Sequence, residues 1–494
     1  MHSTEHSQAD IDDARLIRSL SAIIPADSVL HETEDLKPYE CDGLSAYRSV
    51  PIAVVLPDTV EQVQAILRLC HELKVPVVAR GAGTGLSGGA LPFERGIVLS
   101  LARFNDILDI NPKRRTATVQ PGVANLAISQ AADPFGLYYA PDPSSQIACT
   151  IGGNVAENSG GVHCLKYGLT VHNILQLKVI TIDGELLCIG GSGLDSAGYD
   201  LLALLTGSEG MLGVIVEVTV KLLPKPERAQ VIMAAFDDVV KAGEAVGNII
   251  AAGIVPAGLE MMDRLAIRAA EDFVHAGYPL DAEAILLCEL DGTNAEVSEH
   301  ILKVREVLKR SGANEVRTAK DEAERQIFWQ GRKAAFPAVG RISPDYYCMD
   351  GTIPRKQLPL VLKTMAELSE QYQLPVANVF HAGDGNLHPL ILYDANIPGE
   401  LERTEEFGGR ILELCVEVGG TITGEHGVGM EKIDQMCVQF APAELSQFHA
   451  VKAAFDPRAL LNPGKAVPTL HRCAEFGAMH VHKGQLPFPE LERF

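Results

Sequence analysis

Five glycines within nine residues constrain the fold of this chain more than any other feature of its sequence. They lie in residues 81–89, GAGTGLSGG, directly after residues 75–80, VPVVAR, which are typical of a buried strand. Glycines leave main-chain N–H groups unobstructed, so successive amides of such a loop can surround a pyrophosphate. Three of the glycines also fit a G-x-G-x-x-G pattern, but that nicotinamide fingerprint must open a helix, and here the strand-like residues 97–101 come next. The sequence therefore predicts a phosphate-binding loop rather than a nicotinamide site or a flexible surface loop.

The segments around this loop alternate between helix and strand. Thr59 and Gln62 form a capping box ahead of the helical residues 60–73, and further strand-like and helical segments follow the loop. A proline-rich break at residues 223–226, LPKP, then precedes long helical segments such as residues 322–336. Because 494 residues exceed the size of a single hydrophobic core, we expect an α+β chain of two or three domains with a boundary at this break.

Composition and charge exclude several classes of partner. Hydrophobic residues make up 47% and charged residues 21%, and no apolar run approaches the ~18 residues of a membrane span. The formal net charge of −22 argues against nucleic acid or anionic lipid as a direct partner, and any site for an anion must supply local positive charge. The N-terminus lacks the pattern of a secretory signal, and the ten cysteines show no CxxC pair. We therefore expect a soluble cytoplasmic protein without an iron–sulfur cluster of its own.

Two histidines flank a predicted hairpin turn in the second half of the chain. Asp384-Gly385 is a favoured centre for a two-residue turn between two apolar segments. Such a turn pairs His381 with His388, so both imidazoles lie on one face with Cβ atoms about 5 Å apart. The pair could bind one divalent ion or could merely pack, and for two histidines alone packing is the more common outcome.

Four ordered motifs give the chain a specific family resemblance. The motifs are RGAGTGLSGGA at 80–90, PDPSS at 141–145, TIGGNVAENSGG at 150–161 and TGSEGMLGVI at 206–215. Together they resemble the FAD domain of the vanillyl-alcohol-oxidase type, also called the PCMH type. YECDGLSAYR near the start, and VFHAGDGNLHPL, GEHGVG and LLNPGK near the end, make nearly the whole chain similar to the D subunits of bacterial glycolate oxidases. D-lactate and D-2-hydroxyglutarate dehydrogenases share these motifs more loosely.

The resemblance implies an α+β fold in which a two-part PCMH-type FAD-binding domain joins a C-terminal α+β cap domain with an antiparallel sheet. The implied segments are an N-terminal segment packing on the FAD domain (1–46), the FAD-binding domain (47–226), the substrate and metal-binding cap domain (227–430), a helical return to the FAD domain (431–470) and a tail (471–494). Within the return, residues 455–465 are expected to form a short helix broken by proline and glycine. The tail holds His471, Cys473, His480 and His482, for which a disordered or partner-contacting role outweighs a second metal site.

The resemblance also implies non-covalent FAD. Relatives that attach FAD through a histidine carry it in the glycine loop, where Thr84 stands here. Short polar side chains among the implied residues suit the flavin ring edge and the ribityl chain, namely Ser145, Thr150, Asn154 and Ser159, and Glu209 with Gly210 is placed near the adenine. The full implied set is Pro57, Arg80, Gly81, Ala82, Gly83, Thr84, Gly85, Ser87, Gly88, Gly89, Pro141, Asp142, Ser145, Thr150, Gly153, Asn154, Asn158, Ser159, Gly160, Gly161, Glu209, Gly210, Ile215 and Asn462.

Metal and catalytic residues are implied in the second half of the chain. Glu425 and His426 lie between glycines that allow a tight backbone, and the family places a metal-binding glutamate and a catalytic histidine there. His381, His388 and Glu425 thus become ligands of a zinc, manganese or iron(II) ion. Such an ion keeps open positions where a 2-hydroxy acid can chelate, His426 then removes the hydroxyl proton, and the C2 hydride passes to flavin N5.

Arg332 is implied to bind a substrate carboxylate, because arginine offers paired hydrogen bonds that lysine lacks, although a lone helical arginine is more often solvated. Tyr346 and Tyr347 are weaker candidates. Relatives that oxidise 2-hydroxyglutarate have a lysine and an asparagine near the positions where Cys348 and Leu390 stand here. A second substrate carboxylate is therefore not expected. The implied reaction is oxidation of glycolate to glyoxylate, with D-lactate to pyruvate as the second choice.

Partner chains follow from the same resemblance. A second flavin-domain subunit and an iron–sulfur subunit are implied to pass electrons toward membrane quinone. The chain is then cytoplasmic, and peripheral at the membrane only through these partners. Two alternatives stay open: a stand-alone D-lactate dehydrogenase, and a non-catalytic FAD-binding subunit, which would have no need of the combined histidine, glutamate and arginine set.

Overall fold

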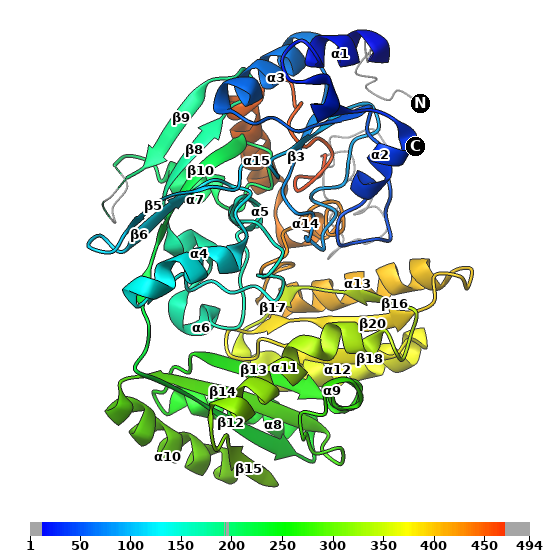
Figure 1. Ribbon diagram of the computed structural model, residues 1–494. Coiled ribbons are helices and arrows are strands. Elements are labelled where there is room, and N and C mark those ends of the chain that lie inside the picture. The colour runs from blue at the N-terminus through cyan, green and yellow to red at the C-terminus, as the bar shows by residue number, and fades with distance from the viewer. Residues whose placement is uncertain (1–11, 192, 194–196, 470–494) are drawn as a thin grey trace.

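The upper half of the molecule in Figure 1 begins with a four-stranded sheet. The structure, a computed structural model, describes residues 12–191, 193 and 197–469. The sheet has the order β1-β2-β4-β3, in which β2, β4 and β3 run parallel and β1 pairs antiparallel with β2. Its strands are β1 (Val29–Leu30), β2 (Ala53–Val55), β3 (Val77–Arg80) and β4 (Ile97–Ser100). Helices α1 (Asp13–Leu20) and α3 (Val60–Leu73) share its buried apolar core, and the expected capping box of Thr59 and Gln62 at α3 is confirmed.

A five-stranded antiparallel sheet completes this half, with the order β5-β6-β10-β8-β9. Its strands are β5 (Ile107–Asn111), β6 (Thr116–Val119), β8 (Ile174–Ile180), β9 (Leu186–Gly190) and β10 (Val214–Lys221). Helices α4 (Asn125–Ala132), α5 (Ile151–Glu157) and α7 (Leu201–Leu205) bury apolar side chains with it. β7 (Leu137–Tyr138) pairs with β11 (Leu223–Pro224).

The lower half is a seven-stranded antiparallel sheet with helices on both faces (Figure 1). The order is β15-β12-β14-β13-β18-β20-β16. Its strands are β12 (Arg228–Phe236), β13 (Gly258–Asp263), β14 (Ala284–Gly292), β15 (Glu315–Thr318), β16 (Asp345–Cys348), β18 (Val376–Phe380) and β20 (Pro389–Tyr393). One face packs against α8 (Val239–Ala251), α10 (Asn294–Arg310), α12 (Leu358–Tyr372) and α13 (Glu400–Glu417). The other packs against α9 (Arg264–Val274) and α11 (Glu322–Val339).

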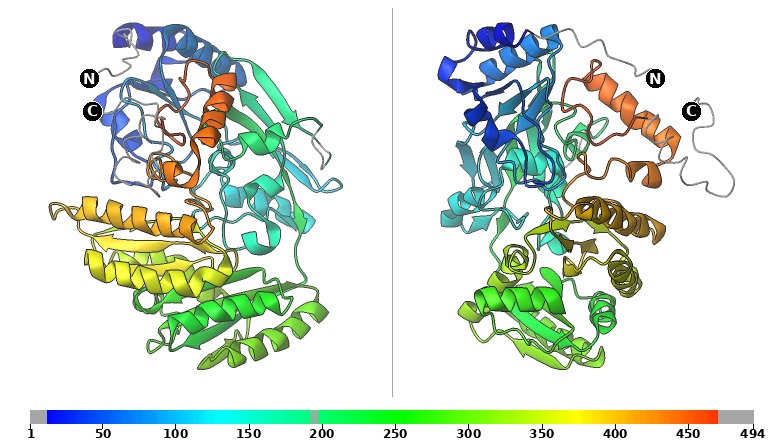
Figure 2. Two further views of the ribbon diagram at one scale, coloured as in Figure 1. Left: turned by 180° about the vertical axis from the view of Figure 1, so that it is seen from behind. Right: turned by 90° about the vertical axis from the view of Figure 1, so that its right-hand side faces the viewer.

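After the lower half the chain returns to the upper one, as the orange and red segment of Figure 2 shows. It forms α14 (Met436–Gln439) and α15 (Pro442–Phe455), and Leu461 then bridges Val77 of β3 in parallel. The helix expected over residues 455–465 is wrong. Ala459 and Asn462 have φ of +50° and +44°, a left-handed conformation that ends helices, because pairing with the edge of β3 replaces helical hydrogen bonds. The histidine-containing tail from residue 471 lies outside the described residues.

Candidate functional site

The glycine loop leaves β3 without opening a helix, as the sequence predicted, and lines a cavity of about 420 Å³ between the two halves. Gly83 has a φ of +71°, and a Cβ on Gly81 would lie 2.2 Å from Thr150 Oγ1, so neither position accepts a side chain without a shift. Among the described residues, no acceptor is found for the main-chain N–H groups of residues 82–85. The loop therefore fits the phosphates of a dinucleotide, which would accept these hydrogen bonds.

The structure brings together most of the residues expected at the cofactor. Those that line the cavity are Arg80, Gly81, Ala82, Gly83, Thr84, Gly85, Gly89, Ser145, Thr150, Gly153, Asn154, Ser159, Glu209, Gly210 and Ile215. Those outside its lining are Pro57, Ser87, Gly88, Pro141, Asp142, Asn158, Gly160, Gly161 and Asn462.

Glu209 and Asn462 form hydrogen bonds between segments that are far apart in the sequence. The carboxylate of Glu209 accepts hydrogen bonds from the amides of Val428 (2.7 Å) and Gly429 (2.6 Å), so it connects the upper half to the segment after the lower sheet. Asn462 donates to the carbonyl oxygens of Gly89 (2.9 Å) and Glu209 (2.7 Å). Glu209 thus lines the cavity while its carboxylate is held by protein amides, and Asn462 fixes the end of the glycine loop.

His381 and His388 come from the hairpin of β18 and β20, but not in the expected register. His381 pairs with Asn386 rather than with His388, so the turn contains residues 382–385 instead of two residues. The physical reason is tertiary: Gly385, at φ +86°, lies against Ile353, and a Cβ there would come within 2.1 Å of the Ile353 carbonyl oxygen. The expectation that both imidazoles share a face is confirmed, with ring centroids 4.9 Å apart.

Glu425 completes a cluster with these histidines. Its Oε1 lies 3.2 Å from Nε2 of both His381 and His388, and the three possible ligand atoms lie within 4.8 Å of one another. Burial alone raises the pKa of Glu425, but the charges and hydrogen bonds of the two histidines reverse this and hold its pKa well below its ordinary value. Two imidazoles and an ionised carboxylate that converge in this way fit a divalent metal ion with open positions.

Behind His381 stands Glu260, which the sequence analysis missed. Its carboxylate lies 2.8 and 2.9 Å from His381 Nδ1, so it orients Nε2 toward Glu425. Arg332 Nη2 lies 2.6 Å from Glu260, and both side chains are 1% exposed. A carboxylate that holds the outer nitrogen of a histidine is the usual support of a metal-binding imidazole. The signal in the sequence was an acid between apolar neighbours, Leu259 and Met261, in the strand GLEMMD.

Arg332 was expected to bind a substrate carboxylate. In the structure its side chain is buried against Glu260 and does not line the cavity. Its Nε and Nη1 are buried and have no hydrogen-bond acceptor among the described residues. Its direct role toward substrate stays a prediction. Lys333, the next residue of α11, does line the cavity, and no ion pair is found for it in the described part of the chain.

His426 lies on the same turn as Glu425 and stacks on His388, with ring centroids 5.0 Å apart and planes within 6°. Burial lowers its pKa to about 4, so its imidazole is neutral near pH 7. Its Nδ1 is buried and has no partner among the residues that the structure describes. A neutral imidazole with a free nitrogen can accept a proton in the cavity.

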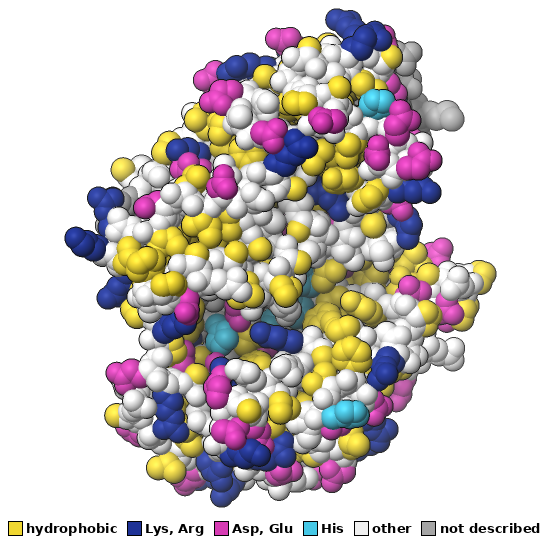
Figure 3. Space-filling view, viewed as in Figure 1, with side chains coloured by type: hydrophobic (Ala, Val, Ile, Leu, Met, Phe, Trp, Pro, Cys, Tyr) yellow, Lys and Arg dark blue, Asp and Glu magenta, His cyan; other side chains and the backbone are white. Residues whose placement is uncertain are grey.

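Lys333 also lines a second cavity of about 350 Å³ that adjoins the first. The rest of its lining is Asp142, Val162, His163, Arg325, Gln326, Trp329 and Gln330. Figure 3 shows a hollow at the junction of the two halves where histidine and basic side chains gather. Lys333 therefore lines both the cavity that contains His388, Glu425 and His426 and this second, polar cavity. Tyr346 and Tyr347 do not line either cavity.

Comparison with known proteins identifies the family. Residues 51–190 match the model of an FAD binding domain, and residues 225–466 match that of the C-terminal domain of FAD linked oxidases. The Escherichia coli K12 protein named glycolate oxidase subunit GlcD is 70% identical over 485 residues, which cover 98% of this chain and 97% of that protein. The chain belongs to the FAD-linked oxidases. The Bacillus subtilis protein of the same name is 41% identical, over 86% of this chain and 91% of that protein.

Solved structures support the same fold for this FAD-linked oxidase. A p-cresol methylhydroxylase with substrate bound superposes with a TM-score of 0.79, covering 93% of this chain and 97% of that one, at 19% identity. At that identity the likeness concerns the fold alone, and it confirms the expected PCMH-type α+β architecture. The chain is thus an FAD-dependent oxidoreductase. Within the described residues, no helix is both long enough and apolar enough to cross a membrane.

Proposed function

We propose that this chain oxidises glycolate to glyoxylate. The observation that carries the proposal is the 70% identity, over nearly the full length of both chains, to a protein named glycolate oxidase subunit GlcD. The site supports it, because the cavity that the glycine loop lines also contains His388, Glu425 and His426. An anionic substrate with a hydroxyl group beside its carboxylate suits a cavity that combines a neutral base with nearby Lys333.

The residues of the chain divide the work of such a reaction. When bound, FAD supplies an acceptor for the hydride that leaves C2, and a divalent ion supplies a Lewis acid that lowers the pKa of the substrate hydroxyl. The main-chain amides of residues 82–85 would hold the FAD phosphates, and His381, His388 and Glu425 would hold the metal. His426, whose ring lines the cavity, accepts the hydroxyl proton at its unprotonated ring nitrogen, which the neutral state of the ring allows.

Substrate size and attachment of the cofactor follow from particular residues. Cys348 and Leu390 pair across β16 and β20, are buried and do not line the cavity, so they offer no charge to a second substrate carboxylate. D-lactate is the second candidate, because proteins named D-lactate dehydrogenase, such as that of Archaeoglobus fulgidus at 34% identity, cover 84% of this chain. Thr84 stands in the glycine loop in place of an attachment histidine, so FAD is held without a covalent bond.

Anaerobic reduction of the flavin tests the proposed reaction. Purified protein is mixed with glycolate, D-lactate, L-lactate and D-2-hydroxyglutarate, and the bleaching of the flavin absorbance is followed. We expect glycolate to bleach it fastest, D-lactate more slowly and D-2-hydroxyglutarate not at all. Bleaching by none of these acids, or by 2-hydroxyglutarate in preference, would overturn the proposal.

A metal-dependent step needs a separate test. We expect His381→Ala and Glu425→Ala to remove a metal detected by elemental analysis and to slow bleaching, while FAD stays bound. Val239→Ala, on α8 outside the lining of the cavity, serves as a control that keeps both. Unchanged activity after exhaustive chelation, with no metal found, would show that the histidine cluster is structural.

Both relatives are named as subunits, which supports the proposal that this chain also has partner chains. We propose a second flavin-domain subunit and an iron–sulfur subunit, which pass electrons toward membrane quinone and hold the chain at the inner face of the cytoplasmic membrane. The isolated chain is then expected to reduce artificial dyes with glycolate and to react slowly with oxygen. Hydrogen peroxide formed as fast as dye is reduced would show a self-sufficient oxidase instead.

A further inference from the structure

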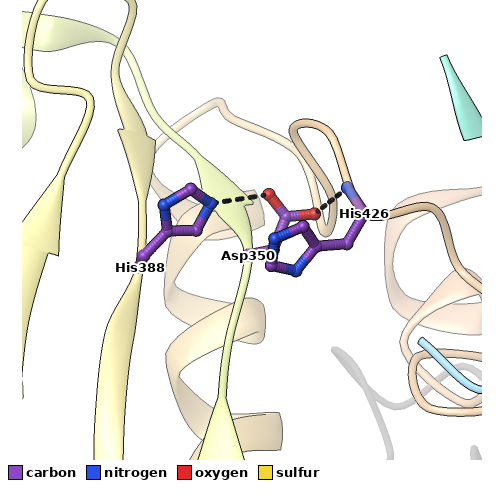
Figure 4. A group of neighbouring side chains, drawn as sticks. All are labelled: Asp350, His388 and His426. Atoms are coloured by element: carbon purple, nitrogen blue, oxygen red, sulfur yellow. Dashed lines mark hydrogen bonds and ion pairs between the residues drawn. The ribbon is translucent and has the colours of Figure 1, made fainter. Parts of the chain in front are cut away.

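Asp350 is a fully buried carboxylate that contacts the turn carrying Glu425 and His426. It follows β16 and is 0% exposed, and Figure 4 shows its carboxylate linked to the His388 ring and to the main-chain nitrogen of His426. Its oxygens accept hydrogen bonds from the hydroxyl of Thr423 (2.6 Å) and from three consecutive amides, those of Gly424 (3.0 Å), Glu425 (3.1 Å) and His426 (2.9 Å). A carboxylate has about four acceptor positions, so this one turn uses nearly all of them.

The charge of Asp350 is balanced by Lys432, which is also 0% exposed. Lys432 Nζ lies 3.1 Å from Asp350 Oδ2 and donates to the Gly427 carbonyl oxygen at 2.8 Å. It thus binds both the carboxylate and the far end of the same turn. Gly427 has a φ of +81°, a conformation that lets the chain reverse directly after His426.

The carboxylate of Asp350 also lies close to His388 of the hairpin. Its Oδ1 lies 3.6 Å from His388 Nε2, the same atom that lies 3.2 Å from Glu425. The carboxylate of Asp350 therefore contacts main-chain amides of the turn and the imidazole of His388 in the hairpin. These two segments come from different parts of the chain, and no regular hydrogen-bonded ladder joins His388 to the turn.

We propose that Asp350, balanced by Lys432, is a positioning residue that fixes the turn at residues 423–426 and thereby places Glu425 and His426 against His388. The inference rests on the proposed function, which gives that placement its purpose. Asp350 acts through other residues, because the turn supplies four donors to its carboxylate and Lys432 supplies a fifth. Four charge-assisted hydrogen bonds to successive donors leave the turn a single conformation.

Two variants separate positioning from simple stabilisation. Asp350→Asn removes the charge and turns one acceptor into a donor that opposes the amides. It also leaves Lys432 without its nearer carboxylate, since Glu431 lies farther away at 3.6 Å. We expect a lower melting temperature and flavin reduction at least 100-fold slower at saturating glycolate, with little change in KM. The double variant Asp350→Asn/Lys432→Met also removes the buried cation, so we expect the melting temperature to recover in part, limited by Glu431, which loses Lys432, while the rate stays at least 100-fold low. Recovery of both would show an ordinary structural ion pair and would overturn the proposal.

A milder pair guards against variants that fail to fold. Thr423→Val removes one hydrogen bond to Asp350, and Thr423→Ser keeps it. We expect the valine variant to be about tenfold slower with KM nearly unchanged, and the serine variant to remain within twofold of the native rate. Equal rates for the two would refute the positioning role. Leu308→Ala, a buried position on the distant α10, serves as the control for lost stability, because it lowers the melting temperature without a change in rate.

Hydrogen exchange gives a readout that does not depend on the substrate. The amides of Glu425 and His426 are expected to exchange slowly in the native protein and at least tenfold faster in Asp350→Asn/Lys432→Met. Native protein that protects these amides but reduces its flavin with no 2-hydroxy acid would contradict the proposed function alone. Protection that persists in the double variant would contradict the role of Asp350 alone.

Discussion

A buried ionic cluster joins the two halves beside the second cavity, and it predicts how stability depends on pH. Glu289 of β14 lies 3.2 Å from Nε2 of His163, which belongs to the upper half, and 2.7 Å from Arg325 of α11. His163 Nδ1 lies 2.8 Å from Asp142. Burial alone raises the pKa of Glu289, but His163 and Arg325 reverse the effect and lower it from 4.5 to about 2.

The size of the effect follows from that pKa. A tenfold change in proton affinity is worth about 1.4 kcal/mol, so a fall from 4.5 to about 2 corresponds to about 3 kcal/mol of folding free energy. Because the pKa is lower in the folded state, this stabilisation is present above pH 4.5 and is lost as the pH falls toward about 2. The contribution of His163 to stability depends on pH in the opposite direction. Its pKa is raised well above 6.5, because Asp142 and Glu289 outweigh burial, so its contribution is present below pH 6.5 and is lost as the pH rises through the folded value.

Urea unfolding of Glu289→Gln against the native protein, at a series of pH values, measures this contribution. We expect the variant to be less stable by about 3 kcal/mol near pH 6, and the difference to shrink steadily below pH 4.5. Glu299→Gln is the matched control, because that exposed glutamate pairs only with Lys303 on the surface of α10, and such pairs contribute about 0–1 kcal/mol. A difference below about 1 kcal/mol near pH 6, or one that stays constant down to pH 3, would refute the reasoning.

Three further predictions concern the site. Acid precipitation should release all flavin into the supernatant, because Thr84 replaces an attachment histidine; absorbance of the pellet would reveal covalent flavin. Glu260→Gln should weaken metal binding about 10–100-fold by calorimetry, since it weakens the hold on His381 Nδ1, and an unchanged affinity would remove Glu260 from the metal site. Lys333→Gln should raise KM for glycolate several-fold and flatten its dependence on salt, whereas Lys333→Arg keeps both; equal KM values for all three proteins would show that Lys333 does not attract the anion.

The features that could be predicted from the sequence are local ones. The glycine loop directly follows its strand, the capping box of Thr59 and Gln62 lies within four residues, and the two hairpin histidines are seven residues apart. Each of these patterns is fixed by main-chain geometry over a short stretch. The family resemblance added Glu425 and His426, which no local pattern connects to the hairpin.

The supporting residues could not be predicted in the same way. Glu260, Asp350 and Lys432 each act on a residue that is far away in the sequence or on another strand, and none belongs to a motif. Buried acids and lysines in apolar surroundings are rare, because desolvating a charge is costly unless a partner is present. A charged residue between apolar neighbours, such as Glu260 in GLEMMD, is therefore the signal by which such residues can be recognised, but it does not say which partner they contact.

The error in the hairpin shows why some predictions survive a wrong detail. The turn was expected at Asp384-Gly385, which pairs residues whose numbers sum to 769, while the observed pairs His381 with Asn386 and Asn378 with Pro389 sum to 767. The register therefore moved by two residues. Side chains of a strand alternate with period two, so a shift of two keeps every side chain on its face, whereas a shift of one would have turned His388 away from His381. The convergence of the histidines therefore depends on the parity of the register and not on the exact position of the turn.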